Sequence, residues 1–161
     1  MSANGAEYRH YYADQLEAGC RYQDFVCREL HRRGIVLQNM TSKKYQSKME
    51  NLLGMEIKFD QKMGQTGNVY IETHEKANPN NTEYVESGIL RDDTTWLYAI
   101  GDRKVLFIFG KNLLRGLAIN PRSWMVQRKT DTSRGFTFPV AKARALAEKV
   151  VEFEHGENVS P

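Results

Sequence analysis

Two carboxylates in the first half of the chain have the type and spacing for chemistry on a phosphate group. Asp60 follows the alternating segment 55–59, and Glu72 follows the apolar residues 69–71 twelve positions later. If the two segments pair as strands, both carboxylates lie at one end of a sheet. Mg²⁺ prefers oxygen ligands, and a bound cation activates water and neutralises charge on a phosphate under attack. Asp60 and Glu72 are therefore candidate metal ligands, with a solvated strand end and a cross-strand charge as the alternative.

Two basic residues share strand faces with these carboxylates. Lys58 lies two positions before Asp60, and His74 lies two positions after Glu72. Since side chains two apart on a strand point to the same face, each basic group is expected beside its carboxylate. There it can orient the attacking water or stabilise the phosphate, so both are candidate catalytic residues. An ordinary surface role for His74 stays open.

Further basic residues form two clusters that suit a phosphate backbone. The candidate nucleic-acid contacts are Lys43, Lys44, Lys48, Arg122, Arg128, Lys129 and Arg134. Trp124 lies within the second cluster and either stacks on bases or anchors a loop. The net charge of +3 and the isoelectric point of about 8.8 permit nucleic-acid binding without requiring it, because a solvated surface has the same composition.

Hydrophobic periodicity predicts the elements that position these residues. Apolar residues at helical spacing predict a helix over 7–33, with Cys20 and Cys27 on its buried face. Alternation predicts strands over 55–60 and 69–74, which we expect to form a β-hairpin around the turn 62–67. The later elements are a helical turn at 84–90, strands at 94–100 and 105–109, a helix at 112–117, a polar loop at 120–135, a strand at 136–138 and a helix at 139–154. With a second helix over 42–53, this order predicts an α/β domain with a mixed sheet flanked by helices.

Three residues in these elements have defined expectations. Glu56 either joins the metal site or pairs with Lys58. Ser87 either caps a helix or contacts a phosphate. Trp96 lies in an apolar strand and is expected in the core.

The residues around the two carboxylates resemble the PD-(D/E)XK nuclease superfamily. In that superfamily an Asp at the end of one strand is followed, on the neighbouring strand, by Asp/Glu-X-Lys. The matching positions here are Asp60 and then Glu72-Thr73-His74, with histidine at the lysine position. The similarity extends over about residues 41–115, through the strings Gly54–Asp60, Thr66–Glu72, Ser87-Gly88-Ile89 and Thr95–Tyr98, and is strongest to a phage- and bacterium-associated branch.

The resemblance implies a fold, a cofactor and an activity. It implies a restriction-endonuclease-like sheet and Mg²⁺ or Mn²⁺ held by Glu50, Asp60 and Glu72, with Glu29 as a rival for Glu50. It also implies hydrolysis of DNA phosphodiester bonds, and it is compatible with a homodimer. One alternative is a nucleic-acid-binding module on the same fold without turnover. The other is an interaction protein with no nucleic-acid role.

Length and composition set the expected organisation. The 161 residues fit one domain, with residues 1–6 and 155–161 expected to be frayed. No apolar run reaches the roughly 18–20 residues that cross a bilayer, and no signal peptide is evident. We therefore expect a cytoplasmic protein, and the resemblance implies a bacterial or phage-infected cell. No phosphate-binding P-loop, Rossmann fingerprint or nucleophile elbow is present in the sequence.

Overall fold

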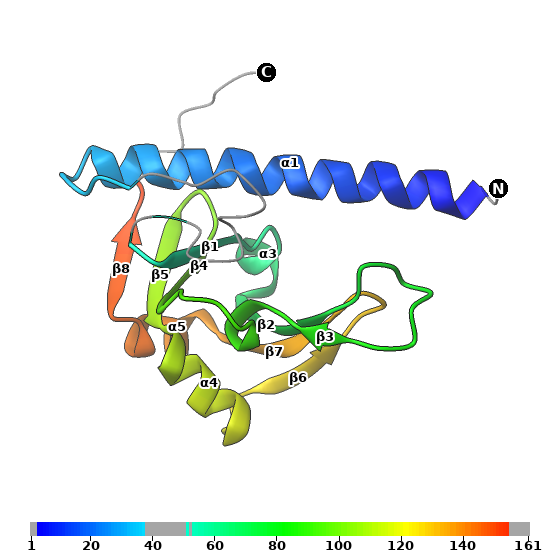
Figure 1. Cartoon of the computed structure of the whole chain (residues 1–161). Helices are drawn as coiled ribbons and strands as arrows, with labels where there is room; N and C mark the ends of the chain where they lie inside the picture. The colour runs from blue at the N-terminus through cyan, green and yellow to red at the C-terminus, as the bar shows by residue number, and fades with distance from the viewer. Residues whose placement is uncertain (1–2, 38–50, 52, 155–161) are drawn as a thin grey trace.

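The computed structural model describes residues 3–37, 51 and 53–154, with side chains from residue 14 onward (Figure 1). Four of the predicted site residues, Lys43, Lys44, Lys48 and Glu50, lie outside the described residues, as does most of the helix expected over 42–53.

The described chain is a mixed α/β structure built on two four-stranded sheets. The first sheet has the order β1 (Met55–Phe59), β4 (Leu97–Gly101), β5 (Val105–Gly110), β8 (Lys149–Glu152). The second sheet has the order β3 (Val85–Glu86), β2 (Asn68–Glu75), β7 (Ser133–Pro139), β6 (Val126–Lys129). Strands β1 and β4 are parallel, and the other neighbouring strands are antiparallel. The α/β class is as predicted, although the strands divide between two sheets.

A long helix and several short ones surround the sheets. The helices are α1 (Ala3–His31), α3 (Met63–Thr66), the 3₁₀ helix η1 (Gly88–Leu90), α4 (Lys111–Ile119) and α5 (Val140–Leu146). Helix α1 crosses the first sheet and extends beyond it toward the N-terminus (Figure 1). Within the described part of the chain, no helix combines the length and apolar character that crossing a bilayer requires.

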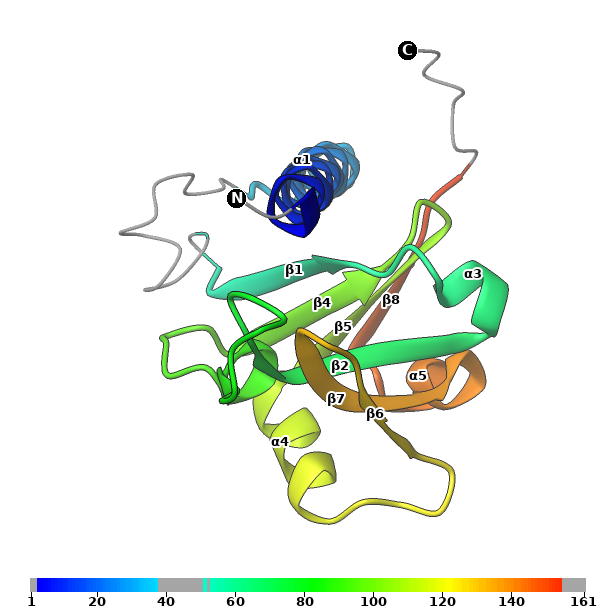
Figure 2. The same cartoon turned by 90° about the vertical axis from the view of Figure 1, so that its right-hand side faces the viewer.

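Helix α1, the first sheet and the second sheet form three layers, and two clusters of buried residues lie between them. One lies between α1 and the first sheet and includes Tyr22, Val26 and Leu30 of the helix. The other lies between the two sheets and includes Phe107 and Phe138, one from each sheet. The first sheet is therefore covered on both faces, by α1 and by the second sheet (Figure 2). This explains why β5 is almost continuously apolar, since a strand covered on both sides has no solvent face.

The expected β-hairpin between 55–60 and 69–74 is wrong. Strand β1 pairs in parallel with β4, whereas β2 pairs with β7 and β3. The intervening residues form helix α3, which ends at Gly67 in the left-handed conformation with a φ of 66°. Because this helix redirects the chain, β2 enters the second sheet instead of returning beside β1.

Two other expected elements also differ from the structure. Residues 120–135 contain β6 and the beginning of β7, where a polar loop was expected. All four residues of β6 are exposed, so this edge strand lacks the hydrophobic alternation that reveals a half-buried strand. The helix expected over 139–154 ends at Leu146, and residues 149–152 pair with β5 as strand β8.

Three side-chain predictions are wrong or only partly right. Trp96 is 63% exposed, because it lies just before β4 and packs along Gly54 at the surface. Cys20 is exposed and Cys27 is half-buried, because the buried face of α1 is formed instead by Tyr22, Val26 and Leu30. By contrast, the two strands predicted at 94–100 and 105–109 are confirmed as β4 and β5, which pair antiparallel.

Candidate functional site

Asp60 links the end of β1 to the edge of β2. Its Oδ2 accepts a hydrogen bond from the Tyr70 amide at 2.9 Å, and its Oδ1 accepts one from the Lys62 amide at 3.1 Å. Burial raises the pKa of Asp60, and these backbone hydrogen bonds act in the opposite direction. The Tyr70 amide lies on the edge of β2 that faces away from β7, so no strand accepts its hydrogen bond there. The Asp60 carboxylate supplies the acceptor that this amide needs. Asp60 has a structural role in joining the two sheets.

Replacing Asp60 with alanine is expected to lower the free energy of unfolding by about 1–3 kcal/mol, since the Tyr70 and Lys62 amides lose their acceptor. Urea denaturation followed by circular dichroism measures the loss. Asp14→Ala is the matched control, because Asp14 is an exposed residue of α1. Equal stability of the two variants would show that the Asp60 contacts contribute nothing.

Glu72 is held by two serine hydroxyls. Ser87 Oγ donates to Oε1 at 2.8 Å, and Ser133 Oγ donates to Oε2 at 2.9 Å. The Tyr70 hydroxyl contacts Ser133 Oγ in turn. Ser87 precedes η1 but makes no capping hydrogen bond with its side chain, so binding to Glu72 replaces both roles considered for it. The half-buried carboxylate is therefore fixed in position by its neighbours.

His74 does not share the face of Glu72 as the strand pattern predicted. The register of β2 against β7 shifts between Glu72 and His74, as in a β-bulge, and this interrupts the alternation of side chains. His74 Nδ1 instead lies 2.9 Å from Thr73 Oγ1, and both residues line a separate pocket. The bulge is the physical reason for the error.

The described residues do not complete the expected metal site. Asp60 and Glu72 each use both carboxylate oxygens on protein donors. Asp60 follows β1 of the first sheet, whereas Glu72 lies in β2 of the second sheet. Among the residues that the structure describes, no group of three His, Cys, Asp or Glu side chains is placed to hold a metal ion. The metal site expected at Glu50, Asp60 and Glu72 stays a prediction, because Glu50 lies outside the described residues.

A buried charge cluster lies beside β1. Glu56 is fully buried, and its carboxylate lies 3.0 Å from Lys58 Nζ, 3.4 Å from Lys111 Nζ and 3.6 Å from Arg91. Burial alone would raise the pKa of Glu56, but the three positive charges lower it below its usual value. Of the two roles considered for Glu56, the structure shows the pairing with Lys58.

Asp93 completes this cluster. Its carboxylate lies 2.6 Å from Arg91 Nε and 2.9 Å from Lys111 Nζ, and it accepts a 2.6 Å hydrogen bond from Thr95 Oγ1. Burial opposes ionisation, but these hydrogen bonds prevail and lower the pKa of Asp93 to about 2. The sequence contains no pattern that predicts this cluster, because its members are far apart along the chain.

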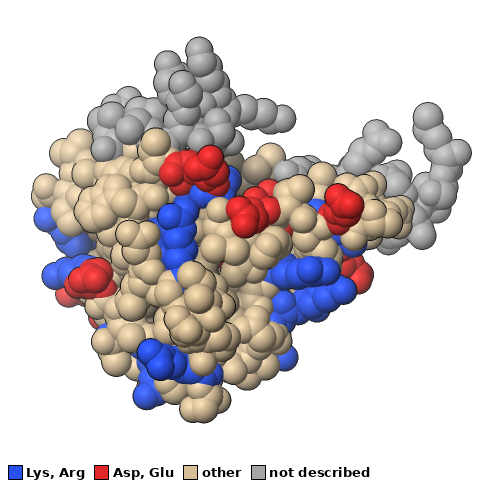
Figure 3. Space-filling model, turned by 60° about the horizontal axis from the view of Figure 1, so that its bottom comes forward, with Lys and Arg blue, Asp and Glu red and all other residues tan. Residues whose placement is uncertain are grey.

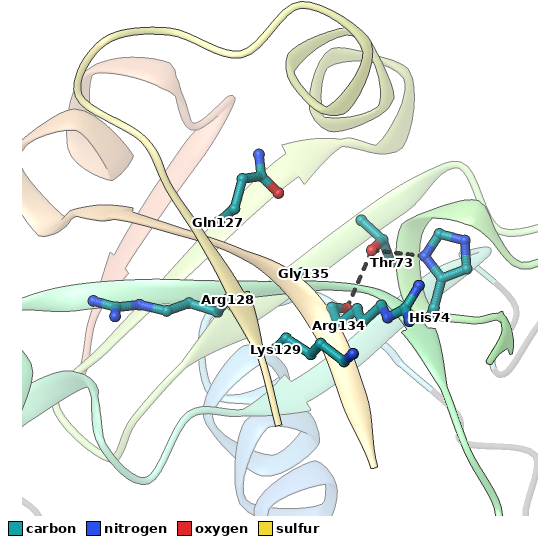
Figure 4. Close-up of a pocket in the computed structure, with 7 residues that line it drawn as sticks. All are labelled: Thr73, His74, Gln127, Arg128, Lys129, Arg134 and Gly135. Carbon is teal, nitrogen blue, oxygen red and sulfur yellow. Dashed lines mark hydrogen bonds between the residues drawn. The ribbon is translucent and has the colours of Figure 1, made fainter. Parts of the chain in front are cut away.

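A basic pocket of about 360 Å³ lies where β2, β6 and β7 meet (Figure 4). Its lining residues are Thr73, His74, Gln127, Arg128, Lys129, Arg134 and Gly135. None of these is acidic, and none of the three lysine and arginine residues pairs with a carboxylate of the described chain. The sequence predicted these three as nucleic-acid contacts, and the structure brings them together with His74. More broadly, Lys and Arg side chains form several groups on the face seen in Figure 3.

Tyr84 organises the positive charges beside this pocket. The Arg134 guanidinium lies 3.8 Å from the centroid of the Tyr84 ring, and the ammonium groups of Lys76 and Lys129 lie at 4.8 and 5.8 Å. The Tyr84 hydroxyl donates to the Thr130 carbonyl at 2.6 Å. The sequence did not single out Tyr84, because this tyrosine is about 50 residues from the hairpin it contacts.

The other members of the second basic cluster lie apart from the pocket lining. Arg122 is exposed. Trp124 is half-buried and packs edge-on against Phe138, with ring centroids 5.8 Å apart, while Lys142 lies over its ring. These contacts match the alternative in which Trp124 anchors its loop.

Comparison with protein-family models, curated proteins and solved structures found no significant match to this chain. Fold and site together define a mixed α/β protein with a basic pocket at the end of its second sheet.

Proposed function

We propose that this protein binds nucleic acid through the basic pocket. The observation that carries the proposal is that Arg128, Lys129, Arg134 and His74 line one hollow, and that no acidic residue lines it. A phosphate backbone is the anion that such a surface commonly meets, because lysine and arginine replace its condensed counterions.

The charge state of the pocket supports this proposal. Elsewhere in the described chain, arginines such as Arg21, Arg33 and Arg144 are neutralised by nearby glutamates. Arg128 instead approaches the Thr137 hydroxyl at 3.4 Å, and Arg134 stacks on Tyr84. These contacts position the guanidinium groups and leave their charge uncompensated, as an anion-binding site requires.

A second candidate is metal-dependent hydrolysis of DNA on a restriction-endonuclease-like fold. The observation that favours it is the position of Glu72, which directly precedes the pocket residues Thr73 and His74 and is fixed by two serines. Glu72 would then be one of two acidic residues, with Glu75, that directly adjoin the pocket residues Thr73 and His74 in the sequence. Asp60 and Glu72 bind separate protein donors, so their geometry does not define a catalytic step.

The binding test uses fluorescently labelled single- and double-stranded DNA at increasing salt. We expect Lys129→Glu combined with Arg134→Glu to weaken binding roughly 100-fold at low salt and to reduce the dependence of log affinity on log salt by about two. The matched control combines Arg21→Glu with Lys149→Glu, which changes the net charge equally at exposed positions on α1 and β8. Equal weakening in both double variants would overturn the pocket as the binding site.

The cleavage test adds Mg²⁺ or Mn²⁺ to the same DNAs, with EDTA as a control. Glu72→Gln is compared with the wild type after both have been shown to unfold at the same urea concentration. Metal-dependent cutting that the variant loses supports hydrolysis. Salt-dependent binding without cutting favours the binding function alone.

A further inference from the structure

We infer that the basic pocket selects a terminal phosphate group, a phosphomonoester at the end of a nucleic-acid strand, and that Tyr84 positions the cations that recognise it. This inference rests on the proposed function and adds the chemical class of the group that is bound.

Three cations from separate segments gather around one aromatic ring. Lys76 follows β2, Lys129 ends β6 and Arg134 lies in β7, and their charged groups lie 4.8, 5.8 and 3.8 Å from the centroid of the Tyr84 ring. The negative face of the ring attracts each cation, but the like charges repel one another. Such a concentration of positive charge favours a ligand that carries more than one negative charge.

A phosphomonoester meets this requirement better than an internal phosphodiester. It carries a charge of about −1.5 to −2 at neutral pH and presents three acceptor oxygens. An internal phosphate carries a single negative charge, and two of its oxygens continue into the strand. The planar guanidinium of Arg134, with its several N–H donors, suits the free oxygens of a terminal phosphate.

The cations are held in place before any ligand binds. The Tyr84 hydroxyl donates to the Thr130 carbonyl at 2.6 Å, and the Lys76 amide donates to the Thr132 carbonyl at 2.7 Å. These bonds dock the segment after β2 against the turn between β6 and β7. The Lys76 ammonium also donates to the carbonyls of Pro79 and Asn81. A site that is ordered in advance loses less conformational entropy on binding, so it binds the terminal phosphate more tightly than a disordered site would.

The arrangement of the side chains favours binding the end of a nucleic-acid strand over binding its interior. Figure 4 shows Arg134 directed toward His74, with Lys129 beside it at the same end of the two strands. Arg128 is directed away from them in the same view. Arg134, Lys129 and His74 therefore share one end of the pocket, where a terminal phosphate would bind, while Arg128 is placed to contact a different part of the strand.

The experiment measures the affinity for one oligonucleotide with a 5′-phosphate, a 3′-phosphate or hydroxyl groups at both ends. We expect one phosphorylated end to bind at least about tenfold more tightly than the unphosphorylated strand. Tyr84→Leu should abolish this preference. Tyr84→Phe should keep a measurable preference, because the ring that faces the cations remains although the hydrogen bond to Thr130 is lost. Thermal unfolding of both variants checks that they are folded.

Inorganic phosphate and a nucleoside monophosphate serve as competitors and separate a strand end from a free anion. We expect both to compete only at much higher concentration than the phosphorylated strand. Equal affinity for inorganic phosphate would overturn the assignment to a nucleic-acid end. Equal, salt-dependent binding of phosphorylated and unphosphorylated strands would overturn the inference but leave the proposed function intact. Absence of binding to every strand would overturn both.

Discussion

Replacement of Lys111 by methionine is expected to lower the free energy of unfolding by about 3–5 kcal/mol, the usual cost of removing one partner from a buried ion pair. Lys111 is only 1% exposed, and its ammonium group lies 2.9 Å from Asp93 and 3.4 Å from Glu56. It also donates to Thr95 Oγ1 at 2.7 Å. Methionine fills a similar volume, so the measured loss reports mainly the unpaired buried charge.

Urea denaturation of Lys111→Met measures this effect, and Lys104→Met is the matched control because Lys104 is exposed. Adding Glu56→Gln to Lys111→Met should restore part of the lost stability, since one buried negative charge is removed with the positive one. The double-mutant cycle therefore separates charge pairing from packing. A loss in Lys111→Met no larger than in the control would contradict the prediction.

Replacement of Gly135 by alanine is expected to cost about 3 kcal/mol or more, because the close approach of β7 to β2 leaves no room for a side chain. A Cβ atom at this position would lie 2.0 Å from the Ile71 carbonyl oxygen and 3.0 Å from the Glu72 Cα. Both neighbours are backbone atoms of a paired strand, so they can move only if the pairing is disturbed. Because Gly135 also lines the basic pocket, this variant should lose nucleic-acid affinity together with stability.

The control for this variant is Gly116→Ala in helix α4. A Cβ atom at Gly116 would meet no other atom within 4 Å, and alanine favours a helix by about 1 kcal/mol over glycine. Thermal and urea unfolding should therefore show a loss for Gly135→Ala and a small gain for Gly116→Ala. An unchanged unfolding midpoint in Gly135→Ala would show that β2 and β7 can separate at little cost.

Local periodicity was sufficient to predict two of the elements. Helix α1 has apolar residues at helical spacing, and the sequence of β1 alternates between apolar and charged residues, so both were predicted near their observed positions. The alternation in β1 does not mark a solvent face, because Glu56 is fully buried in the charge cluster. The antiparallel pair β4 and β5 was predictable because the short turn at Gly101 leaves few other arrangements. These features depend on residues close together in the sequence.

Pairing between distant segments was beyond this kind of prediction. The parallel contact of β1 with β4 joins residues about 40 positions apart, and the burial of the first sheet on both faces decides it. Strand β6 is exposed along its whole length, so hydrophobicity contains no signal for it. The apolar residues of β8 also fit the spacing of a helix. These residues form a strand because they pair with β5.

The candidate site divides in the same way. The sequence alone determined that Arg128, Lys129 and Arg134 form a basic cluster, since they are neighbours in the chain. Only the tertiary structure added His74 and Tyr84, because the bulge in β2 and the docking of the segment before β3 bring them to the β6–β7 hairpin. The tertiary structure also gave Asp60 and Glu72 their hydrogen-bond partners, since each carboxylate binds groups supplied by other strands and loops. Residue types and local spacing are written in the chain, whereas the partners of a charged group depend on which surfaces the folded core brings together.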